Sequence, residues 1–137
     1  NITYIYKYIY IYINQYNINI YNNNVLHVGC IGIGINGGDY YTLTSGNNNV
    51  LYNTIYDFSK WKRTYLPGLY FGGVGLNVSF NNITFGPHNG ITGGGNVQES
   101  CNNIFSYNLI QNTTFETSDS GAFYTCGQSE QAWINRG

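Results

Sequence analysis

The chain has 137 residues, a net charge of −1 and 8% charged residues, where roughly 25% is usual in soluble domains. This length bounds the chain to one domain, and the low charge excludes a disordered acidic or basic tail. With no basic surplus, nucleic acid is excluded as a partner. The 18 Gly and 15 Tyr, together with many Asn, Ile and Thr, suit turns and strands, so the composition predicts an all-β fold.

Residues 1–24 differ in composition from everything after them, because seven are Asn, seven are Ile and seven are Tyr. The interval is too short and too rich in Tyr to span a membrane, and it lacks the cleavage site of a signal peptide. We expect a low-complexity leader at 1–24 and a partial domain at 25–137 of a longer protein. Two alternatives for the leader are a true β segment and an AT-rich, wrongly joined gene model.

Beyond the leader, two short units alternate along the chain. An Asn-x-Ile unit begins at Asn53, Asn81 and Asn108, at intervals of 28 (81 − 53) and 27 (108 − 81) residues. A unit of glycines around apolar residues recurs near Gly34, and again in segments 68–73, 90–94 and 121–127. A period in the twenties with short strands and Gly-rich turns is typical of a β-solenoid.

The repeats predict stacked coils, each with two or three short parallel strands and with Ile, Val, Leu and Phe side chains inside. Asn at a fixed corner would form a hydrogen-bonded ladder from coil to coil. The fold class predicted is an all-β, right-handed, single-stranded parallel β-helix of about four coils. The alternative is an antiparallel sandwich, which should show hairpin turns; only Asn36-Gly37 and Asn89-Gly90 have that signature.

Four segments that carry these repeats follow one another in a recognisable order. They are GGDYYTLTSGNN (37–48), NTIYDFSKWKRTYLPGLYFGGVG (53–75), NNITFGPHNGITGGGN (81–96) and NLIQNTTFETSDSGAFYTCGQ (108–128). In this order and spacing the chain resembles the right-handed parallel β-helix repeat proteins of the pectate-lyase-like superfamily. It departs from their pattern where the family often has His, at Tyr56, Thr84 and Gln111, and where it often has Glu, at Ser106.

The resemblance implies an extracellular or periplasmic protein that acts on polysaccharides, similar to glycoside hydrolases, lyases and epimerases. Carried over position by position, it marks these motif residues: Asp39, Arg63, Pro87, His88, Asn89, Glu116, Asp119, Gly121 and Tyr124. We expect substrate contacts from Asp39, Trp61, Arg63, Asn89 and Tyr124.

Three side chains are candidates for catalysis. Glu116 and Asp119 stand three residues apart, and glycoside hydrolysis commonly needs two carboxyl groups. Asp119 is the expected acid, base or nucleophile, with Glu116 or Asp39 as its partner; the alternative is a turn-capping role before Gly121. His88 lies in GPHNG and could be a general base or a sugar-binding donor, or a hydrogen-bonded corner residue.

A cationic cluster with aromatic residues occupies segment 57–67. Lys60, Lys62 and Arg63 alternate with Trp61 and Tyr65. Aromatic rings can stack on sugars, and cations bind the carboxylates of acidic polysaccharides. The alternative is a solvated loop held in place by Trp61.

No metal or cofactor motif is present. Cys30, Cys101 and Cys126 form no CxxC pair, and no second His stands at ligand spacing, so we expect no cofactor; calcium is an alternative that nothing in the sequence supports. A disulfide between Cys101 and Cys126 is left open.

We therefore expect a secreted, monomeric, carbohydrate-active protein with a polysaccharide as its partner and with neither nucleic acid nor membrane. Glycosidase activity is the first expectation, ahead of a lyase or an epimerase. The alternatives are a non-catalytic glycan-binding or structural module, and a truncated fragment without activity.

Overall fold

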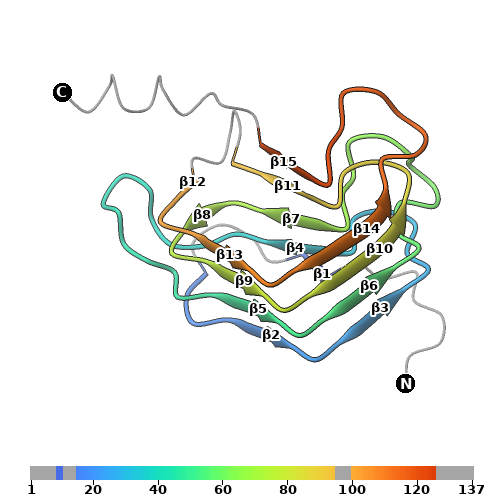
Figure 1. The fold of residues 1–137 in the computed structure, drawn as a ribbon. Coiled ribbons are helices and arrows are strands. Elements are labelled where there is room, and N and C mark those ends of the chain that lie inside the picture. The colour runs from blue at the N-terminus through green and yellow to red at the C-terminus, as the bar shows by residue number, and fades with distance from the viewer. Residues whose placement is uncertain (1–8, 11–14, 95–99, 126–137) are drawn as a thin grey trace.

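The fold is a parallel β-solenoid of about four coils, seen in a computed structural model that describes residues 9–10, 15–94 and 100–125 (Figure 1). The described residues contain strands and turns and no helix, and therefore no helix that could cross a membrane. Every pairing between named strands is parallel. This excludes the antiparallel sandwich and confirms the predicted fold class.

Three sheets run along the solenoid, and each coil adds one strand to each of them. Sheet A consists of β1 (Ile9–Tyr10), β4 (Ile33–Ile35), β7 (Leu69–Phe71), β11 (Ile91–Gly93) and β15 (Phe123–Thr125). Sheet B consists of β2 (Asn19–Tyr21), β5 (Asn49–Leu51), β9 (Asn77–Ser79) and β13 (Ile104–Ser106). Sheet C consists of β3 (Asn24–Leu26), β6 (Thr54–Tyr56), β10 (Asn82–Gly86) and β14 (Leu109–Thr113). A small extra sheet pairs β8 (Gly73–Val74) with β12 (Ser100–Cys101).

The register repeats the period predicted from the sequence. Thr54 pairs with Asn82, and Asn82 with Leu109, at the same 28- and 27-residue intervals as the Asn-x-Ile units. The glycine units coincide with the strands of sheet A from β4 onward. Part of the leader interval also belongs to the solenoid, because β1, β2 and the start of β3 lie within residues 9–24; residues 1–8 and 11–14 lie outside the described part.

The core is a set of columns in which apolar side chains stack on their register partners. One column passes through Val25, Ile55 and Ile83 to Ile110, and these side chains are buried except for Ile110, which is partly buried. Since successive coils present identical positions to each other, side chains of similar shape pack without gaps. Burial of each Ile contributes about 1.5–3 kcal/mol relative to leaving it exposed.

The predicted Asn ladder occupies the two-residue turns between sheets B and C. The Asn81 Oδ1 accepts hydrogen bonds from the backbone N–H and the side-chain amide of Asn53, at 2.9 and 3.0 Å. Its own amide donates to the Val50 and Ser79 carbonyls and to the Asn108 Oδ1, at 2.8, 3.1 and 2.9 Å. Buried backbone groups at this corner are satisfied in this way, and the ladder holds the coils in register.

The residue before each ladder Asn has a left-handed backbone. The φ angles are 55° at Asn22, 58° at Tyr52, 59° at Phe80 and 54° at Tyr107. Asn tolerates this conformation, whereas for other side chains it costs about 1–2 kcal/mol per residue. In three coils this position is aromatic (Tyr52, Phe80 and Tyr107), so the left-handed backbone there costs free energy.

Replacing Asn81 with Ala tests the ladder. The change removes the partners of the Val50 and Ser79 carbonyls and of the Asn53 N–H, and an unsatisfied buried polar group costs about 1–3 kcal/mol. We expect Asn81→Ala to lower the free energy of unfolding by about 3 kcal/mol, as measured by urea denaturation. Asn19→Ala, at an exposed outward position, is the control and should change it by about 0.5 kcal/mol or less. Equal losses in the two variants would contradict the structural role of the ladder.

Candidate functional site

Three loops meet at the edge between sheets C and A, here called the C–A edge. They are residues 57–68 between β6 and β7, residues 87–90 between β10 and β11, and residues 114–122 between β14 and β15. Figure 1 shows the first and last of them rising side by side on the right of the view. Because stacked coils repeat the same turn, segments 30 to 60 residues apart in sequence become neighbours here.

Loop 57–68 is anchored at its base by the fully buried ring of Phe58. Gly86 makes room for this ring, because a Cβ at Gly86 would overlap it. The Ser59 hydroxyl donates to the Leu66 carbonyl at 2.6 Å and closes the loop. The loop is therefore built into the solenoid at both ends rather than hanging free.

Trp61 docks this loop onto the previous coil. Its backbone N–H donates to the Gly29 carbonyl at 2.9 Å, and its indole covers the Gly29 Cα so closely that a Cβ there would overlap the ring. Most of the indole is still exposed. Trp61 thus holds the loop, as in the structural alternative, and also presents an aromatic surface to solvent.

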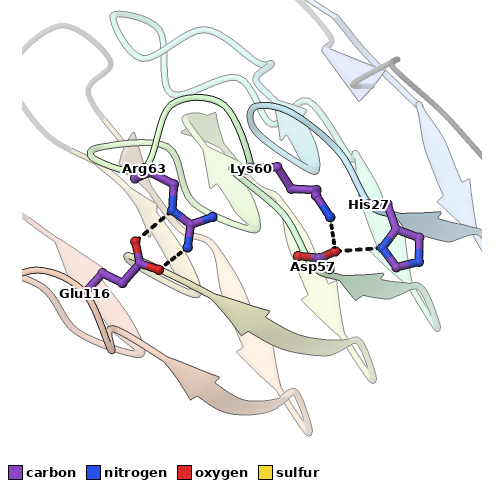
Figure 2. A network of polar contacts seen from close by, with 5 residues as sticks. All are labelled: His27, Asp57, Lys60, Arg63 and Glu116. Carbon is purple, nitrogen blue, oxygen red and sulfur yellow. Dashed lines mark hydrogen bonds and ion pairs between the residues drawn. The ribbon is translucent and has the colours of Figure 1, made fainter.

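Asp57 is the centre of a polar cluster that the sequence did not single out (Figure 2). Its Oδ2 accepts from Lys60 Nζ at 2.6 Å and lies 2.7 Å from His27 Nδ1. Partial burial by itself raises the pKa of Asp57, but the hydrogen bonds and charges of Lys60 and His27 together outweigh it and lower the pKa below 3.8. His27 and Asp57 are 30 residues apart, which is the spacing between the first two coils.

Arg63 and Glu116 connect the first and last loops of the C–A edge. The guanidinium donates through both Nε and Nη2 to the two carboxylate oxygens of Glu116, as Figure 2 shows; the Nε–Oε2 distance is 2.7 Å. The hydrogen bond from Arg63 is the main reason that the pKa of Glu116 is lowered. Glu116 is therefore an ionised carboxylate at neutral pH. The pair is about two-fifths exposed, so solvent screens the attraction and its contribution to stability is small.

His88 is buried in loop 87–90 of the C–A edge. Only 1% of the residue is exposed, the Tyr65 ring lies 5.1 Å from the imidazole, and Nδ1 has no hydrogen-bond partner in the described part of the chain. Burial lowers the pKa of His88, and the negative charge of Asp119 opposes this in part. The imidazole is thus neutral at pH 7 and carries a buried nitrogen that can accept a proton or a hydrogen bond.

Asp119 lies in a turn that hydrogen bonds from Tyr124 and to Asn89 hold in place. It has a left-handed φ of 53°, and its Oδ1 accepts a hydrogen bond from the Tyr124 hydroxyl at 2.8 Å. The buried Asn89 accepts from the Gly121 N–H at 2.9 Å and donates to the Thr92 hydroxyl at 3.3 Å. Asn89 and Tyr124, which we expected to bind substrate, thus both contact the 119–121 turn.

Asp39 is the one predicted site residue that the fold places elsewhere. It lies in the loop between β4 and β5, at the opposite side of the solenoid from the C–A edge (Figure 1). There its Oδ1 accepts from the Tyr41 N–H at 2.9 Å, and its backbone pairs with Thr44. Of the two partners considered for Asp119, only Glu116 is on the same edge.

Metal ligands do not gather at this edge. Among residues 9–10, 15–94 and 100–125, no three His, Cys, Asp or Glu side chains are placed to hold an ion. Cys30 forms no disulfide with a described residue, and Cys126 lies outside the described residues.

The Asp57 cluster predicts an acid-sensitive contribution to stability. Since the pKa of Asp57 is lower in the folded chain, the unfolded chain holds the proton more readily. The contribution is fully present above about pH 5 and is lost as the pH falls through the lowered pKa. We expect Asp57→Asn to flatten the decline of unfolding free energy below about pH 5, measured by urea denaturation across a pH series. Lys60→Gln should flatten it partly, and an unchanged acid slope in Asp57→Asn would rule out this cluster as its source.

No family model, no curated protein and no solved structure matches the chain. What the C–A edge can bind therefore follows from its own side chains.

Proposed function

We propose that this chain is a secreted, carbohydrate-active β-helix protein that binds polysaccharide at the C–A edge and cleaves it as a glycosidase. The observation that carries the proposal is the convergence of three loops that bring Trp61, Arg63, Glu116, His88 and Asp119 to one edge. The resemblance to pectate-lyase-like β-helix proteins supports it, because four of these five residues occupy motif positions of that family.

Binding rests on loop 57–68. The exposed part of Trp61 offers an apolar surface for a sugar ring, and the exposed Lys62 next to it has no ion-pair partner among the described residues. Arg63 already binds one carboxylate, that of Glu116, in the forked arrangement that suits carboxylates. An acidic polysaccharide fits this loop better than a neutral one.

Catalysis needs two groups with different protonation states. Glu116 is kept ionised by Arg63, so it suits the part of the base or nucleophile. Asp119 is then the second carboxyl group of the pair, and the neutral His88, on which its negative charge acts, serves as a positioning group.

The second candidate is a non-catalytic glycan-binding module. It is favoured by the use of Glu116 in an ion pair between loops and of Asn89 in hydrogen bonds within the chain. In that case the same edge binds polysaccharide, and the carboxyl groups only hold its loops.

A polysaccharide panel assayed with the full chain, Asp119→Asn and Asp39→Asn separates these candidates. Loss of a carboxyl group that transfers a proton reduces the rate by about 10²-fold or more, so we expect Asp119→Asn to lose release of reducing ends while it still binds. Asp39→Asn is the matched control, because it removes a carboxylate on the other side of the solenoid, and it should keep full activity. Equal activity in Asp119→Asn would remove Asp119 from the site; binding without cleavage by the unaltered chain would establish the binding module.

A further inference from the structure

A row of aromatic side chains runs along the outside of the corner between sheets B and C. The rings of Tyr52, Phe80 and Tyr107 stack on one another, with centroids 4.9 and 5.0 Å apart and planes within 5° and 8° of parallel. Tyr21 meets Tyr52 edge-on at 5.4 Å. These four residues are called the B–C ridge; the turns that carry them lie one above another at the bottom of Figure 1.

The side chains of the ridge are not part of the hydrophobic core. Tyr52, Phe80 and Tyr107 are 48%, 45% and 81% exposed, and each has the left-handed backbone described above. The first coil has Asn22 at this position, which shows that the turn needs no aromatic residue. Contiguous exposed apolar side chains concentrate at binding surfaces.

The chemistry around the ridge is uncharged throughout. Each coil contributes two strands and a turn to this corner, and none of these segments contains Asp, Glu, Lys, Arg or His. The segments are residues 19–26, 49–56, 77–86 and 104–113. Amide and hydroxyl side chains, among them Asn49, Thr54 and Asn82, are partly exposed on the strands on either side of the turns, although the Asn82 Oδ1 is itself buried. The charges of the described chain lie instead in the C–A loops and at Asp39.

A second aromatic row flanks the far end of sheet C. Tyr56 and Phe85 stack at 5.6 Å, and Phe85 meets Phe115 at 5.7 Å. The outer face of sheet C is therefore bounded by aromatic side chains at both ends of its strands. Thr54 and Asn82 lie between the two rows on adjacent strands.

We propose that the B–C ridge and the adjoining outer face of sheet C bind an uncharged, extended polysaccharide, with successive coils contacting successive sugars. A surface that repeats at every coil gives the same contacts to each unit of a repeating polymer. The ring spacing is close to the advance per sugar of an extended β-1,4-linked chain. Tyr and Phe provide rigid contact area at a low cost in side-chain entropy, and the Asn amides both donate to and accept from sugar hydroxyls.

The ridge itself is separate from the C–A edge, although the outer face of sheet C reaches that edge at the Phe85–Phe115 contact, and it goes beyond the function proposed there. The C–A loops present cations that suit an acidic glycan, whereas the ridge has no charge and nothing to attract one. Binding at the ridge does not need Arg63 or Asp119, so either site can fail without the other.

The test uses the full chain, with cellohexaose in calorimetry and microcrystalline cellulose in a sedimentation assay. The ridge variant is Tyr52→Asn, Phe80→Asn and Tyr107→Asn combined; Asn22 shows that Asn is accommodated at this position, so the variant keeps its fold. We expect the unaltered chain to bind both probes and the ridge variant to lose affinity by about tenfold or more. Tyr41→Asn is the matched control, because Tyr41 is 87% exposed on the loop between β4 and β5, and it should bind as the unaltered chain does.

Three results would overturn the proposal: no binding of either neutral probe by the unaltered chain, equal binding by the ridge variant, or equal loss in Tyr41→Asn. Analytical ultracentrifugation adds a further check. If the unaltered chain binds no glycan, and the ridge variant sediments with a lower mass than the unaltered chain, the ridge is a contact between copies of the chain instead. Arg63→Gln separates the two sites, because it should keep cellohexaose binding whatever it does to acidic polysaccharides. Loss of cellohexaose binding in Arg63→Gln would place the neutral glycan at the C–A edge and count against the ridge.

Discussion

The side-chain amide of Asn53 accepts hydrogen bonds from Asn23 in the preceding coil and donates one to Asn81 in the next coil, to which the Asn53 backbone N–H also donates. Such bonds are made in a two-residue turn that is buried on its inner side, where unpaired backbone groups would be costly. Each coil can enter the stack only if its Asn reaches the turn of the next, and this fixes the register of sheets B and C. The columns of core side chains, the neighbouring loops and the outer rows of rings all depend on that register.

The hydrogen-bonded turns restrict the spacing of strands in sheets B and C but not in sheet A, and this explains where the loop length varies from coil to coil. Strands of sheets B and C recur at the same intervals of 30, 28 and 27 residues, because the turn between the two sheets is always two residues long. Sheet A recurs at 36 (69 − 33), 22 (91 − 69) and 32 (123 − 91) residues. The differences are taken up by the loops that lead into and out of sheet A. Additional length is therefore tolerated at the C–A edge, where loop 57–68 is long enough to present cationic and aromatic side chains to solvent.

The same architecture separates two kinds of chemistry onto different sides of one small molecule. At the C–A edge, ion pairs such as Arg63–Glu116 and the Asp57 cluster tie loops of different coils together. At the corner between sheets B and C, the two-residue turns carry uncharged side chains, and similar contacts repeat from coil to coil. A charged, irregular edge suits recognition of one short stretch of a ligand, and a neutral, periodic corner suits a long one.

The sequence by itself determined the parallel stack, since the 28- and 27-residue intervals between Asn53, Asn81 and Asn108 are the register of sheet C and the ladder spacing. It also marked most residues of the C–A edge, because Arg63, His88, Glu116 and Asp119 lie in segments with recognisable motifs. Only the tertiary structure decided that Asp39 is on the other side, that Arg63 binds Glu116 53 residues away, and that His27 meets Asp57. The reason is physical: the irregular loops around sheet A have no period from which a register could be read. Side chains at their tips become neighbours only once the coils have stacked.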